Sequence, residues 1–171
     1  DDGALAALAA QFNDALSGVG FLSLRNIGID ESLRDRVFEA SQAFFAQPEA
    51  EKRKLGYSDA EDNFGYQGVC EESLMPGSAP DLKEAMTLRD LHKPRDFDWP
   101  DRAFRDLLMT FHDDCLAAAY RILRVFAIDL QMDREYFVQK HGGENVTMRI
   151  LHYPPLPQQS EQQLGAGPHT D

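Results

Sequence analysis

Cysteine is scarce in this sequence: its 171 residues include only Cys70 and Cys115, which lie far apart and outside any Cys-x-x-Cys pair. This scarcity argues against a disulfide framework and against a zinc site built from thiolates. Cys115 falls on the apolar stripe of a predicted helix, where we expect a small buried hydrophobe. Because so little cysteine suits a reducing compartment, we predict a cytoplasmic protein.

Long apolar runs and an excess of basic residues are also missing. No apolar stretch approaches the roughly 20 residues that a membrane-spanning helix needs, so we expect no membrane partner. Basic residues number 17 against 29 acidic ones, which gives a formal net charge of −12. Since such an acidic surface repels phosphate backbones, we expect no nucleic-acid partner.

The composition that remains is that of a folded globule. Apolar residues make up 43% and aromatic residues 10% of the chain, and its length suffices for one domain with a sizeable core. The sequence begins at Asp1 without a methionine and stops at Asp171, directly after a stretch rich in glycine and proline. We therefore expect both ends to be cut from a longer protein.

Apolar residues recur at helical spacing in several segments. Residues 4–16 predict a first helix, and Asp30 is a good N-cap for a second. The strongest pattern runs from Phe104 to Phe126 and predicts a long helix with one buried face. A short helix over residues 133–139 is expected to follow.

Extended segments are predicted at residues 20–25, 64–69, 85–88 and 146–153. In the last of these, apolar and polar residues alternate, which is typical of a strand. We expect its even-numbered face to be apolar and to pack on the helices. Its odd-numbered face places Arg149 and Tyr153 on one side, with Leu151 between them. The charged run from Glu49 to Lys54 is expected to be a solvated helix end.

The sharpest chemical signal is the closing triplet His169-Thr170-Asp171. In an extended segment, residues i and i+2 point to the same side, so this imidazole and this carboxylate can hold one cation. Two such ligands and a distant histidine make the facial triad of non-haem Fe(II) oxygenases. A second His-x-Asp, His112 and Asp114, lies in the long predicted helix. Residues two apart are about 200° apart there, so we expect solvated helix surface.

Six stretches carry a further signal, in a fixed order over nearly the whole chain. They are residues 20–29, residues 44–52, Gly65-Tyr66, Asp81-Leu82-Lys83-Glu84, residues 148–155 and residues 164–171. Together they resemble motifs of the isopenicillin N synthase-like family of Fe(II)- and 2-oxoglutarate-dependent oxygenases. Each motif alone is weak, but six in the right order are hard to obtain by chance. Ile27 stands where the family usually has a histidine.

The resemblance implies an α+β fold with a jelly-roll (double-stranded β-helix) core that is incomplete in this chain. Residues 1–145 would form a mainly helical amino-terminal region packed on that core. Residues 146–171 would form the first part of the core, with His169 and Asp171 as two ligands of Fe(II). The third ligand, a histidine, and the arginine that grips 2-oxoglutarate would lie beyond the sequence.

In the family, an Asn-x-Tyr pair on the equivalent strand helps to hold the co-substrate. Leu151 stands at the Asn position, whereas Tyr153 matches, so the resemblance implies that Tyr153 contacts 2-oxoglutarate. Arg149 on the same face favours a substrate that carries an anionic group. The alternatives are a Tyr153 hydroxyl that only meets solvent and an Arg149 that only forms a structural salt bridge.

The function that the resemblance implies is oxidation of a small-molecule substrate by O₂, with hydroxylation the commonest outcome and with release of succinate and CO₂. The missing Asn keeps open an iron-dependent oxidase of the same fold that needs no 2-oxoglutarate. From another class, a non-catalytic helical binding domain with an incidental His-x-Asp is the remaining alternative.

Overall fold

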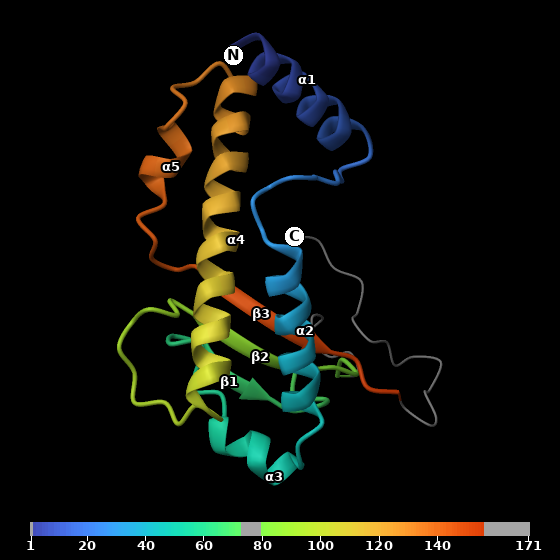
Figure 1. Cartoon of the computed structure of the whole chain (residues 1–171), viewed down its shortest axis with the longest axis vertical. Coiled ribbons are helices and arrows are strands. Elements are labelled where there is room, and N and C mark those ends of the chain that lie inside the picture. Colours follow the sequence, from blue (N-terminus) through green and yellow to red (C-terminus); the bar gives the residue numbers. More distant parts are fainter. Residues whose placement is uncertain (1, 73–79, 156–171) are drawn as a thin grey trace. The chain divides into compact units, whose positions relative to one another are not determined.

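The computed structural model describes residues 2–72 and 80–155 (Figure 1). Along the chain the elements are α1 (Asp2–Gly18), α2 (Glu31–Phe45), α3 (Glu49–Lys52), a 3-10 turn (Arg53–Leu55), β1 (Phe64–Gln67), β2 (Glu84–Arg89), α4 (Arg102–Asp129), α5 (Tyr136–Lys140) and β3 (Thr147–His152). The chain divides into two compact units. One consists of residues 1–35 and 106–144, and the other of residues 36–105 and 145–171.

The first unit is held by a small apolar core between α1 and α4. Ala9, Phe12 and Val125 are buried in it, and the ring of Phe12 meets Phe126 edge-on with centroids 5.8 Å apart. At the rim of this core, Asn13 donates a hydrogen bond of 2.8 Å to Asp129. The helical spacing read from the sequence is therefore confirmed, because the apolar stripes of the two helices pack together.

The cap predicted for the second helix is confirmed. The carboxylate of Asp30 accepts hydrogen bonds from the backbone N–H groups of Ser32 (2.7 Å) and Leu33 (3.1 Å), which makes it the N-cap of α2. The helix expected over residues 133–139 starts later, at Tyr136. Its N-cap is Glu135, which makes no side-chain cap, and Asp133 only accepts a hydrogen bond from the N–H of Glu135 in the turn before it. The long helix α4 is confirmed over Arg102–Asp129.

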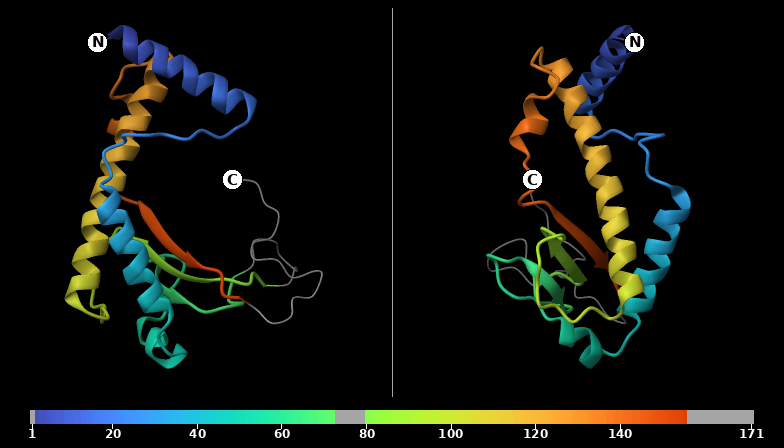
Figure 2. Two further views of the ribbon diagram at one scale, coloured as in Figure 1. Left: turned by 45° about the vertical axis from the view of Figure 1, so that its right-hand side comes forward. Right: turned by 60° about the vertical axis from the view of Figure 1, so that its left-hand side comes forward.

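The second unit contains a three-stranded antiparallel sheet in the order β1-β2-β3 (Figure 2). The central strand β2 pairs with β3 over its whole length, from Glu84 opposite His152 to Arg89 opposite Thr147. On its other edge it pairs with β1. Helices together with an antiparallel sheet give the predicted α+β character.

The strand predicted at residues 20–25 is wrong, because the structure shows irregular backbone there. Phe21 in this segment is 83% exposed. A strand needs the edge of another strand to satisfy its backbone groups, and no described strand pairs with these residues.

Two polar residues expected at the surface are buried instead. His112 follows Leu108 by four residues and precedes Cys115 by three, which places it on the inward stripe of α4. Lys52 ends α3 and sends its ammonium group to a buried carboxylate of the sheet, Glu84. Both errors arise because residue type alone does not show which partners a side chain will meet.

Candidate active site

Strand β3 presents two chemically different faces. Met148, Ile150 and His152 on the even-numbered face are partly buried, whereas Arg149 and Leu151 on the other face are exposed. This alternation confirms the pattern predicted from the sequence.

On the even-numbered, partly buried face of β3, His152 contacts a buried carboxylate, that of Glu84. Glu84 is only 3% exposed, and its Oε1 lies 2.7 Å from Nδ1 of His152, the residue directly opposite it in the sheet. Its Oε2 accepts hydrogen bonds from Lys52 Nζ at 2.5 Å and from the hydroxyl of Tyr66. Burial raises the pKa of Glu84, but these three hydrogen bonds outweigh it and hold the pKa below its usual value. Glu84 is therefore an ionised structural anchor.

Aromatic packing supports this anchor. The ring of Phe45 stacks on the imidazole of His152 with centroids 5.2 Å apart, and Phe44 meets the ring of Tyr66 edge-on. Burial, followed by hydrogen bonds to Glu84 and Glu49, raises the pKa of Tyr66, so its hydroxyl keeps its proton. These contacts fix the end of β3 that directly precedes Tyr153.

The other face carries Arg149, which is tied into the sheet. Its Nε donates to the hydroxyl of Thr87, its cross-strand neighbour, at 3.1 Å. Its Nη2 lies 2.7 and 2.6 Å from the two carboxylate oxygens of Glu72. Arg149 therefore forms a salt bridge, one of the two alternatives that the sequence left open, and its guanidinium remains partly exposed. The sequence did not point to Glu72 or Thr87, because only the strand register brings them to Arg149.

Tyr153 follows the last residue of β3 and is 49% exposed. Within the described part of the chain its hydroxyl makes no hydrogen bond, so it can donate one to a ligand carboxylate. The structure thus brings Arg149, Leu151 and Tyr153 to one exposed stretch of chain, as the alternation predicts. The binding roles of Arg149 and Tyr153 stay predictions.

His169 and Asp171 lie outside the described residues. Their donor types, an imidazole nitrogen and a carboxylate oxygen, fit the ligand chemistry of ferrous iron in a facial triad. Among the described residues, β3 and then Pro154 and Pro155 lead along the chain toward this pair.

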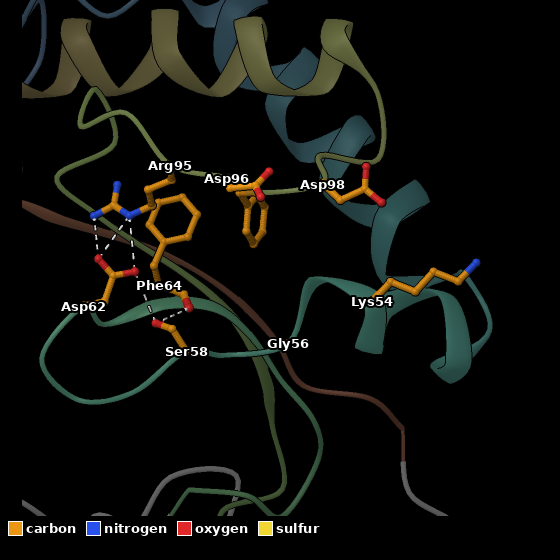
Figure 3. Close-up of a pocket in the computed structure, with 9 residues that line it drawn as sticks. Lys54, Gly56, Ser58, Asp62, Phe64, Arg95, Asp96 and Asp98 are labelled. Carbon is orange, nitrogen blue, oxygen red and sulfur yellow. Dashed lines mark hydrogen bonds and ion pairs between the residues drawn. The ribbon is translucent and has the colours of Figure 1, made fainter.

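A hollow of about 500 Å³, which the sequence did not single out, lies beside β1 in the second unit. Figure 3 shows Arg95 turned toward Asp62 at one end of it and Lys54 at the other. The Nε of Arg95 lies 3.1 Å from Asp62, and its guanidinium lies over the ring of Phe64 at 4.2 Å. The hydrogen bond from Arg95 lowers the pKa of Asp62. Because Arg95 and Asp62 already form an ion pair with each other, we assign this hollow no ligand-binding role.

Within residues 2–72 and 80–155, no helix combines the length and the apolar character that crossing a membrane requires.

Comparison with known proteins identifies relatives over the whole chain. The chain is 28% identical, over 190 aligned residues, to the 2-oxoglutarate-Fe(II) type oxidoreductase hxnY of Emericella nidulans, covering all of this chain and 54% of the relative. It thus spans about half the length of the curated relatives that it matches.

Solved structures of proteins that bind 2-oxoglutarate are also similar to this chain. A full-length protein of Neurospora crassa, crystallised in complex with alpha-KG, superposes with a TM-score of 0.86 at 28% identity, over all of this chain and 57% of that one. The same protein with alpha-KG and thymine gives 0.77 at 26% identity, over 90% of this chain and 52% of that one. JOX2 in complex with 2OG, Fe and JA gives 0.79 at 28% identity, over 96% and 49%.

A family match carries the assignment further. Residues 1–106 match the family described as "non-haem dioxygenase in morphine synthesis N-terminal". This match covers more than half of the chain and contains the first four of the six motif stretches along the sequence. The chain therefore belongs to the non-haem Fe(II)- and 2-oxoglutarate-dependent oxygenases, in the isopenicillin N synthase-like family that its motifs resemble.

Proposed function

We propose that the full-length protein is an Fe(II)- and 2-oxoglutarate-dependent dioxygenase that oxidises a small-molecule substrate, with hydroxylation as the expected outcome. The observation that carries this proposal is the exposed stretch of Arg149, Leu151 and Tyr153, anchored from behind by Glu84 and followed in the chain by His169-Thr170-Asp171. Relatives crystallised with thymine or with JA support a small-molecule substrate.

The proposal includes a jelly-roll core. Residues 146–171 would begin this core, and residues 1–145 would form the mainly helical region beside it, to which β1 and β2 belong in sequence. Further strands of this core would pack over the odd-numbered face of β3, which is exposed in this chain. Covering that face would exclude water from the groups that meet the substrate.

Different residues of this chain would bind the iron, 2-oxoglutarate and the substrate. His169 and Asp171 would hold the iron, and Tyr153 would donate its hydroxyl proton to a carboxylate of 2-oxoglutarate. Arg149 would face the substrate, on which the sequence favoured an anionic group. Bound iron and 2-oxoglutarate would supply the oxidising chemistry, with O₂ consumed and succinate and CO₂ released.

Anaerobic titration of the full-length protein with Fe(II), with and without 2-oxoglutarate, tests the proposal. We expect a weak charge-transfer absorption only when both are present, and succinate formation after O₂ is added. Iron binding and O₂ consumption that ignore 2-oxoglutarate would identify the oxidase instead. A protein that binds no iron would be the non-catalytic binding domain.

His169→Ala and Asp171→Ala should each abolish the absorption and the succinate formation, because each removes one ligand of the iron. His141→Ala is the matched control, since His141 is an exposed histidine whose ring makes a single hydrogen bond among the described residues, with the backbone carbonyl of Phe137. Normal turnover by either ligand variant would remove the ligand assignment.

A further inference from the structure

The charge of Arg149 is already compensated inside the protein. Its Nη2 lies 2.7 and 2.6 Å from the two oxygens of Glu72, and its Nε is used by Thr87. Among the described residues its Nη1 makes no hydrogen bond. What Arg149 can offer a ligand is therefore the N–H groups of Nη1, without an unopposed positive charge.

Glu72 is held in place by the chain around it. Its backbone carbonyl accepts a hydrogen bond of 2.8 Å from the N–H of Asp81. Its carboxylate also lies 3.6 Å from Nζ of Lys83, which in turn contacts Asp81 at 2.6 Å. Glu72 thus belongs to a group of two cations and two anions, Arg149, Lys83, Glu72 and Asp81, with no net charge.

This arrangement discriminates between two kinds of ligand. A carboxylate bound at Nη1 would lie close to the carboxylate of Glu72, and the repulsion would offset its attraction to Arg149. A neutral carbonyl oxygen accepts the same hydrogen bond without that repulsion. Removing the charge of Glu72 would restore Arg149 as an anchor for acids.

We propose that Arg149 recognises a neutral carbonyl group of the substrate, as in an amide, a lactam or a nucleobase, and that Glu72 determines this choice against carboxylates. The inference rests on the proposed function only in placing the Arg149 face in the substrate cavity. It replaces the anionic substrate group that Arg149 favours when considered without its partner.

Matched ligand pairs test the proposal: uracil against its carboxylate orotate, and nicotinamide against nicotinate. Their binding to the full-length protein is measured by ligand-observed NMR, with and without Fe(II) and 2-oxoglutarate under anaerobic conditions. The wild-type protein is expected to prefer the neutral member of a pair. Glu72→Gln is expected to shift the preference toward the acid by up to about fivefold, the change that corresponds to one partly exposed charge contact.

Glu71→Gln is the matched control. Glu71 is the neighbouring glutamate, but its carboxylate pairs with Arg53 and accepts from the N–H of Gly68 instead. It should leave the preference unchanged, and thermal unfolding of both variants checks that they fold.

Three results would overturn the proposal: a wild-type preference for acids, equal shifts in the two glutamate variants, or no binding of any of the four compounds. Failure of the proposed function looks different. In that case the charge-transfer absorption and succinate are absent, while the neutral-to-acid preference still changes in Glu72→Gln.

Discussion

The two faces of β3 contact carboxylates in different environments. Glu84 on the covered face is buried and holds three partners, whereas Glu72 on the other face meets Arg149 where both side chains are partly exposed. Breaking a buried ion pair leaves an uncompensated charge in a medium that solvates it poorly, but a partly exposed pair is replaced by water at little cost. One face therefore stabilises the strand, and the other is free to serve recognition.

The largest effect expected from this difference is on stability. Glu84→Ala removes the buried anion 2.5 Å from the ammonium of Lys52 and leaves only the more exposed Glu49, at 3.5 Å, so we expect it to lower the free energy of unfolding by about 3 kcal/mol. Glu72→Ala should cost less than about 1 kcal/mol. Urea denaturation of the two variants measures both values, and equal losses would show that the faces do not differ in this way.

A pH series sharpens the same comparison. Because the pKa of Glu84 is lower in the folded than in the unfolded protein, its contribution is present above the unfolded value of about 4.3 and is lost as the pH falls through the folded pKa. The stability difference between wild type and Glu84→Gln should therefore shrink below about pH 4. Thermal unfolding midpoints of the two proteins measure this difference as a function of pH. A difference that stays constant as the pH falls below about 4 would contradict an ionised Glu84.

The smallest structural effect is expected at Tyr153. Tyr153→Phe removes a hydroxyl that has no hydrogen bond among the described residues, so stability should change by less than about 0.5 kcal/mol. The KM for 2-oxoglutarate should nevertheless rise by about tenfold or more, since one hydrogen bond to a charged group is lost. Steady-state succinate formation gives both KM and kcat. An unchanged KM would remove Tyr153 from the co-substrate site.

Much of the fold could be predicted because it is local. The cap at Asp30 and the apolar stripe that starts at Phe104 depend on residues within a few positions of each other, and both are confirmed. The strand predicted at residues 20–25 failed because a strand depends on an edge supplied from elsewhere. The burial of Lys52 could not be predicted for a related reason, because its counter-ion Glu84 lies 32 residues away in the sequence.

For the candidate site, the sequence by itself determined which groups are available: the alternation that puts Arg149 and Tyr153 on one side of a strand, and the imidazole and carboxylate of His169-Thr170-Asp171. The tertiary structure decided what those groups meet. It placed Glu84 against His152 across 68 residues of sequence, and Thr87 against Arg149 across 62. Strand pairing joins distant segments through backbone hydrogen bonds, so side-chain partners follow from register, which a local pattern does not encode.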